Sequence, residues 1–109
     1  MIDYQLVKEV DEWLDRDCGR LYHEQPLAQD WARVAKMSEE LGEAIAELIL
    51  ATCQNPRKPL DPEAKTRLLA ELADAALTGV YAIQHFTKNV DETARILSIA
   101  QSKHDSRIP

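Results

Sequence analysis

The sequence predicts an all-α protein with four helices, and three observations support this. Apolar residues recur every three or four positions over long segments, which is the spacing of one helix face. Capping residues and prolines mark the starts of these segments. No segment alternates apolar and polar residues in the manner of a half-buried strand. A chain of 109 residues fits one domain, 1-109, and we expect its helices to pack as a bundle.

The first helix is predicted to run from Asp3 to about Asp17. Asp3 is a good N-cap residue, and Gly19 follows the last periodic position, where a glycine often ends a helix. The apolar residues at helical spacing are Leu6, Val10, Trp13 and Leu14.

The second helix is predicted over about 27–52, after Pro26. One apolar stripe follows it, formed by Trp31, Val34, Leu41, Ile45, Leu48 and Thr52. Its other flank is also apolar or small, and three acids, Glu40, Glu43 and Glu47, run between the two. Gly42 in the interior costs about 1 kcal/mol relative to alanine, which favours a close helix approach there. We expect packing on both sides, with part of the core supplied by another copy of the chain.

The last two helices have clear start signals. Asp61 followed by Pro62 combines an N-cap residue with proline at the first helical position, and this third helix extends to about Phe86. Asn89, with Glu92 three residues later, resembles a capping box and opens a fourth helix over 90–105. Residues 106–109 are expected to fray.

Charge and composition exclude several classes of partner. The net charge is -6 and the pI is near 5.0, whereas a nucleic-acid polymer or an anionic membrane favours a basic face. No apolar run reaches the length of a membrane span, and the N-terminus lacks the pattern of a signal peptide. We therefore expect a cytoplasmic protein.

Cys18 and Cys53 have no metal-site spacing and are expected to be buried or half-buried free thiols.

The most informative stretch is 68–83, where an apolar helix carries only two charges. Both are acids, Glu71 and Asp74, and three-residue spacing puts them on one helix face. Arg67 could neutralise Glu71, but Asp74 has no cation at helical spacing. Carboxylates in apolar surroundings need a proton, water or a metal ion.

A second acidic pair, Glu40 and Glu43, precedes the loop. If the two helices pack antiparallel about the loop near Arg57, Glu43 and Glu71 come level with each other. Four oxygen ligands without histidine or cysteine favour Mg²⁺, for which Mn²⁺ can substitute. The alternative is a solvated acidic face, with Lys36 pairing Glu40.

The pattern EExxE, 27 residues, then ExxD resembles the signature of the MazG-like all-α nucleoside triphosphate pyrophosphatase superfamily. The similarity covers about 31–86. It implies a four-helix bundle-like MazG fold assembled as a homo-oligomer. It also implies Mg²⁺-dependent hydrolysis of an NTP or dNTP between the α and β phosphates, giving a nucleoside monophosphate and pyrophosphate, in nucleotide pool control or house-cleaning.

The resemblance also implies roles for individual residues. Glu40, Glu43, Glu71 and Asp74 match the family's metal ligands, and Glu39 matches an acid that helps a second ion or the attacking water. A homodimer or homotetramer is implied. Phosphate contacts are expected from Lys36, Lys103 and Arg107, and Trp31 is a candidate to stack on a base, although each residue fits a structural role as well.

Two other functions fit the same residues. A dedicated dUTP or phosphoribosyl-ATP pyrophosphatase would use the same acids, but the chain lacks the longer insertion expected of dimeric dUTPases. A non-catalytic helical interaction module would carry the acids as surface features.

Overall fold

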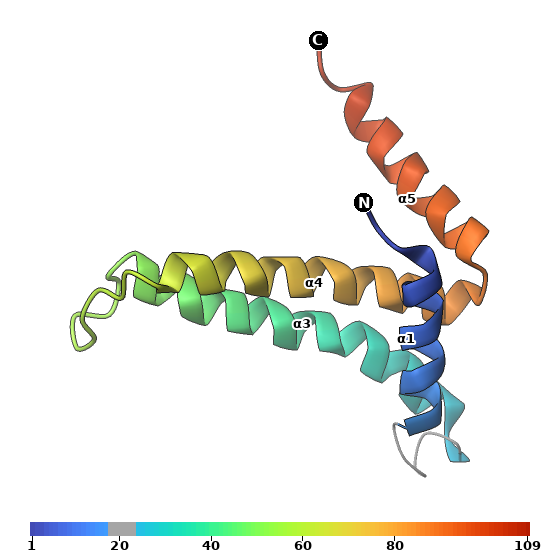
Figure 1. Ribbon diagram of the computed structural model, residues 1–109, viewed down its shortest axis with the longest axis horizontal. Helices are drawn as coiled ribbons and strands as arrows, with labels where there is room; N and C mark the ends of the chain where they lie inside the picture. Colours follow the sequence, from blue (N-terminus) through green and yellow to red (C-terminus); the bar gives the residue numbers. More distant parts are fainter. Residues whose placement is uncertain (18–23) are drawn as a thin grey trace. The chain divides into compact units, whose positions relative to one another are not determined.

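The computed structural model describes residues 1–17 and 24–109 (Figure 1). This part of the chain contains four α-helices and no strand, which confirms the all-α prediction. The helices are α1 (Tyr4–Asp17), α3 (Pro26–Ala51), α4 (Ala64–Thr87) and α5 (Val90–Asp105). None of them combines the length and the apolarity needed to cross a bilayer.

Two predicted helix starts are confirmed by their capping hydrogen bonds. The carboxylate of Asp3 accepts a hydrogen bond from the backbone N–H of Leu6 at 3.1 Å. Asn89 accepts one from the N–H of Glu92 at 2.9 Å. The carboxylate of Glu92 pairs with Arg95 instead of reaching back to the cap, so only half of the predicted capping box forms.

Other boundaries differ from the prediction. Helix α4 begins at Ala64 instead of Pro62, because a turn comes first: Asp61 accepts the N–H of Glu63 through its side chain and that of Ala64 through its carbonyl. Cys53 is exposed, with φ of 57°, in the turn that follows α3, so the expectation of a buried or half-buried thiol was wrong for this residue. Cys18 and the proposed stop at Gly19 lie outside the described residues.

The chain divides into two compact units, and the first consists of residues 1–30 and 80–109. It contains α1, the start of α3, the end of α4, and α5, and α1 contacts α5. Buried apolar residues include Val7, Val80 and Ala82. Polar groups are buried here as well: Thr93 donates a hydrogen bond to Gln84 at 2.7 Å, and both side chains are almost fully enclosed.

The second unit, residues 31–79, is a hairpin of two antiparallel helices. The remaining lengths of α3 and α4 lie side by side in it, joined by the loop 52–63 (Figure 1). The Nε atom of Arg67 on α4 donates a hydrogen bond to the carboxylate of Glu47 on α3 at 3.0 Å, which links the two helices. The fully buried apolar residues of this unit are Ala44 and Ala64, so most of its large apolar side chains are exposed.

Candidate metal centre

Three of the predicted metal ligands meet inside the 31–79 hairpin. Helix α3 supplies Glu40 and Glu43, three residues apart, and α4 supplies Glu71. One carboxylate oxygen from each lies within 4.8 Å of the others. The antiparallel arrangement of the two helices brings these acids level, so side chains 28 and 31 residues apart in sequence face one space.

The carboxylate of Glu71 lacks a donor at one oxygen. Its Oε2 atom is buried and accepts no hydrogen bond from the described residues. Burying a charged oxygen without a partner is costly, and such an atom calls for a proton, a water molecule or a cation. This unsatisfied oxygen, inside a cluster of three acids, is the observation that best fits a bound cation.

Arg67, which the sequence offered as a possible partner of Glu71, binds other acids. Its guanidinium binds Glu47 at 3.0 Å and Asp61 at 2.5 Å. Helical side chains lean toward the N-terminus of their own helix, which carries Arg67 away from Glu71 and toward Asp61. The hydrogen bond from Arg67 holds the pKa of the Asp61 carboxyl below its usual value.

Lys36 is the cation that lies beside the acids. Its ammonium is 3.0 Å from Glu39 and 3.4 Å from Glu40. The hydrogen bond to Glu39 raises the pKa of Lys36 against a smaller opposing effect of burial, and Glu40 adds to the rise. Glu39 is exposed whereas the side chain of Glu40 is only 14% exposed, so Glu39 lies at the edge of the cluster.

Asp74 stands apart from the group of three acids. It is exposed, and its backbone carbonyl accepts a hydrogen bond from the hydroxyl of Thr78 at 2.8 Å. No Asp74 oxygen belongs to the set within 4.8 Å. Its role as a ligand stays a prediction.

The other predicted substrate contacts are exposed. Trp31 is 77% exposed in the chain and lies on the same hairpin as the acids. Lys103 and Arg107 belong to the first unit, at the end of α5 and just beyond it. Roles for all three remain predictions.

The arrangement favours a hard cation. Three carboxylates without nitrogen or sulfur ligands suit Mg²⁺ or Mn²⁺, and three protein ligands leave coordination positions for water and for oxygens of a substrate. The exposed Glu43 and the buried oxygen of Glu71 place the cluster between the hairpin interior and solvent.

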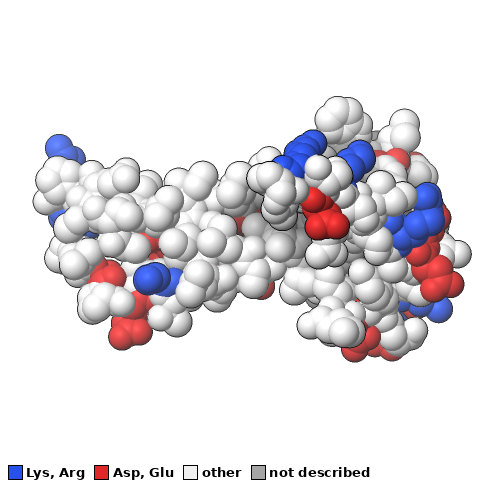
Figure 2. Space-filling view, turned by 90° about the horizontal axis from the view of Figure 1, so that it is seen from above, with Lys and Arg blue, Asp and Glu red and all other residues white. Residues whose placement is uncertain are grey.

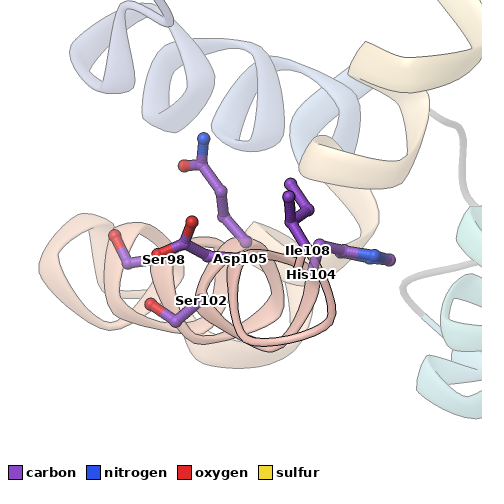
Figure 3. Close-up of a pocket in the computed structure, with 6 residues that line it drawn as sticks. Ser98, Ser102, His104, Asp105 and Ile108 are labelled. Carbon is purple, nitrogen blue, oxygen red and sulfur yellow. The ribbon is translucent and has the colours of Figure 1, made fainter.

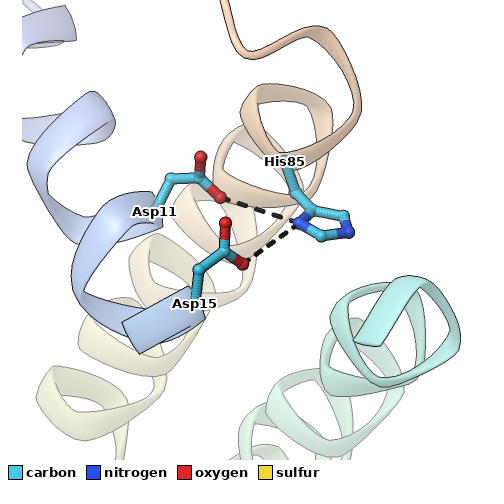
Figure 4. Close-up of side chains that lie close together, drawn as sticks. All are labelled: Asp11, Asp15 and His85. Atoms are coloured by element: carbon cyan, nitrogen blue, oxygen red, sulfur yellow. Dashed lines mark ion pairs between the residues drawn. The ribbon is translucent and has the colours of Figure 1, made fainter. Parts of the chain in front are cut away.

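Sequence reasoning missed a second cluster, in the first unit. Asp11 and Asp15 of α1 point toward His85 of α4 (Figure 4), with ion-pair distances of 3.8 and 3.5 Å. The ammonium of Lys88 lies 2.8 Å from Asp11 and 2.5 Å from Asp15. Because one ammonium already contacts both carboxylates, we assign this cluster a structural role. The four-residue spacing of the two aspartates in the first helix was the available signal.

A surface hollow of about 480 Å³ lies along α5 (Figure 3). All of its lining residues are exposed, so it offers no enclosed ligand group comparable to Glu71. The lining residues are Ser98, Gln101, Ser102, His104, Asp105 and Ile108.

Comparisons of the chain with protein-family models, curated proteins and solved structures give no match.

Proposed function

We propose that this chain is a Mg²⁺-dependent nucleoside triphosphate pyrophosphohydrolase. The observation that carries the proposal is the meeting of Glu40, Glu43 and Glu71 around a buried carboxylate oxygen that has no donor among the described residues. The EExxE and ExxD pattern gives this group of acids its chemical interpretation, with Asp74 as the fourth ligand. The resemblance also implies a homodimer or homotetramer.

The chemistry requires a cation as well as acids. A bound Mg²⁺ would neutralise the triphosphate, which an acidic protein otherwise repels, and would lower the pKa of a bound water. Attack of water on the α phosphorus breaks its bond to the oxygen that bridges to the β phosphate. The products are a nucleoside monophosphate and pyrophosphate, with release of a proton.

Side chains of this hairpin would bind the cation, orient the water and contact the phosphates. Glu40, Glu43 and Glu71 bind the cation, and Glu39 orients the attacking water from the edge of the cluster. The ammonium of Lys36 contacts the carboxylates of Glu39 and Glu40. When substrate binds, this ammonium exchanges one of these contacts for a contact with a phosphate oxygen.

The test is release of pyrophosphate from a panel of nucleotides with Mg²⁺. We expect turnover by the unmodified protein and at least a 100-fold loss in Glu40→Gln and Glu71→Gln, about 2.7 kcal/mol of transition-state stabilisation. Glu63→Gln is the matched control, because Glu63 is exposed and outside the cluster.

Each rival function has its own signature in these assays. Turnover of dUTP alone, or of phosphoribosyl-ATP alone, would replace the general assignment with the dedicated one. Full activity in Glu71→Gln would reject the assigned site. Absence of both turnover and Mn²⁺ binding, measured by calorimetry, would favour a non-catalytic helical module.

A further inference from the structure

We propose that Asp11, Asp15 and His85 form a binding site for a transition-metal ion such as Zn²⁺. All three residues belong to the first unit. Figure 4 shows the two aspartates of α1 pointing toward the histidine of α4, and one ligand atom of each residue lies within 4.8 Å of the other two. The site offers one nitrogen and two oxygens. Imidazole nitrogen suits Zn²⁺, whereas the carboxylates of the hairpin suit Mg²⁺.

A hydrogen bond between His85 and Asp30 leaves the other ring nitrogen available to a metal. The Nε2 atom of His85 lies 2.7 Å from a carboxylate oxygen of Asp30. An ionised carboxylate only accepts hydrogen bonds, so Nε2 carries the proton, and the neutral imidazole then has its lone pair on Nδ1. Nδ1 is the atom that faces Asp11 and Asp15. A histidine that binds a metal almost always donates its other N–H to a partner of this kind.

The separations of the donor atoms fit tetrahedral coordination. Nδ1 of His85 lies 3.5 Å from Oδ1 of Asp15 and 3.8 Å from Oδ1 of Asp11. Around a Zn²⁺ ion with bonds of about 2.1 Å, neighbouring ligand atoms are about 3.4 Å apart. Small side-chain shifts would therefore bring all three atoms to bonding distance. The amide of Gln29 donates a hydrogen bond to Oδ1 of Asp15 at 2.9 Å, which orients that carboxylate.

Burial distinguishes this cluster from an ordinary acidic surface. In Figure 2 the exposed acids of the first unit lie among basic side chains, so an acid at the surface does not by itself mark a metal site. Here the side chains of His85 and Asp11 are only 9% and 2% exposed. Asp15 is 36% exposed, so an ion can reach the site past Asp15, and water can take the fourth coordination position there.

The contacts of Lys88 show that this place holds a positive charge. Its ammonium contacts Oδ2 of Asp11 and Oδ2 of Asp15, and it lies 3.5 Å from Nδ1 of His85. A metal ion bound to the Oδ1 atoms would repel this ammonium, because both cations share the same carboxylates. The side chain of Lys88 is 49% exposed and can turn toward solvent. The ion would then hold α1 to α4 in place of the ammonium, which preserves the structural role of the cluster.

The inference uses no residue of the 31–79 hairpin. It therefore does not rest on the proposed function, and either can fail without the other. Pyrophosphate release with Mg²⁺ tests the enzyme assignment separately.

The experiment is calorimetric titration of the full chain with Zn²⁺, in a Glu71→Gln background that disables the acidic cluster of the hairpin. We expect one Zn²⁺ ion per chain. Asp30→Asn should weaken binding by about 10 to 100-fold, the usual effect of removing the partner of a metal-bound histidine. His85→Gln removes a ligand and should weaken binding by at least about 100-fold. His104→Gln is the matched control, because His104 is an exposed histidine of α5.

Lys88→Met separates a metal site from a purely structural ion pair. Removal of the competing ammonium should tighten Zn²⁺ binding by about 10-fold, whereas a variant that merely loosens the fold would bind more weakly. The inference would be overturned if the chain bound no Zn²⁺, if His85→Gln and His104→Gln lost equal affinity, or if Lys88→Met bound no more tightly.

Nuclear magnetic resonance of the chain without any change at the site covers the case in which a variant fails to fold, as judged by circular dichroism. The ring-proton signals of His85 should shift on addition of Zn²⁺, while those of His104 stay constant. Constant His85 signals would overturn the inference without any variant.

Discussion

The ammonium of Lys88 lies 2.8 Å from a carboxylate oxygen of Asp11, although 77 residues separate them. Asp11 is only 1% exposed, and Lys88 has a φ of 53° directly after α4. A non-glycine residue in this left-handed region carries a backbone cost of about 1 kcal/mol. The ion pair offsets that cost, because it supplies a buried carboxylate with its counter-ion.

Replacing Lys88 with methionine should lower the free energy of unfolding by about 2 kcal/mol. Removing one partner of a fully buried pair costs about 3 to 5 kcal/mol, and the half-exposed side chain of Lys88 reduces that figure. Urea denaturation measures the change. Lys65→Met is the control at an exposed lysine, and an equal loss in both variants would remove the special role of Lys88.

Stability should also depend on pH in the alkaline range through Lys88. Burial lowers the pKa of this amine, but hydrogen bonds to Asp11 and Asp15 more than compensate and hold it above the ordinary value of 10.5. A raised folded-state pKa contributes stability that is complete below the unfolded value and is lost as pH rises through the folded value. The loss should therefore begin above about pH 10.5, and thermal melts of Lys88→Met across that range should lack this component.

Replacing Thr93 with valine should lower the free energy of unfolding by about 2 kcal/mol, because it leaves the buried Gln84 oxygen without its donor. Thr87 contacts the same hydroxyl at 2.8 Å and loses that partner as well. Chemical denaturation of Thr93→Val, Gln84→Leu and the double variant forms a thermodynamic cycle. The loss in the free energy of unfolding should be smaller for the double variant than the sum of the losses for the two single variants. Simple additivity would contradict an interaction between Gln84 and Thr93.

Gly42 and Gly79, which both lie in described helices, should respond differently to alanine. A Cβ on Gly42 meets nothing within 4 Å in the single chain, so Gly42→Ala should stabilise by about 1 kcal/mol through helix propensity. At Gly79 the new methyl lies 3.3 Å from the end of Met37, which reduces the gain. Thermal melts compare them. Destabilisation by Gly42→Ala would instead support the close helix approach that the sequence suggested at Gly42, made by another chain.

Binding of a divalent cation should raise the free energy of unfolding. Mn²⁺ at 100 times its dissociation constant should add about 2.7 kcal/mol to the free energy of unfolding. Glu71→Gln should be more stable by about 1 kcal/mol without metal, because one of three crowded acids is removed, and should lose the response to Mn²⁺. Thermal melts with and without Mn²⁺ measure both effects, with Glu63→Gln retaining the response. A full response in Glu71→Gln would place the cation elsewhere.

Local signals predicted the helices well, because capping is a short-range interaction. Asp3 and Asn89 accept the hydrogen bonds expected of N-caps, and α5 has the predicted bounds. The start of α4 was misplaced by two residues, since Asp61 caps a turn before the helix begins.

Side-chain contacts between residues far apart in the sequence were harder to predict. Antiparallel folding about the loop was enough to expect Glu43 level with Glu71, but the choice of Glu47 and Asp61 by Arg67 depends on side-chain direction. The contact of Lys88 with Asp11 depends on how α1 packs, which no local pattern in the sequence specifies.

The position of Lys88 has a consequence for the order of assembly. Asp11 leaves the ribosome long before the amine that neutralises it, which is 77 residues behind. During synthesis α1 can therefore form this ion pair only after Lys88 has left the ribosome.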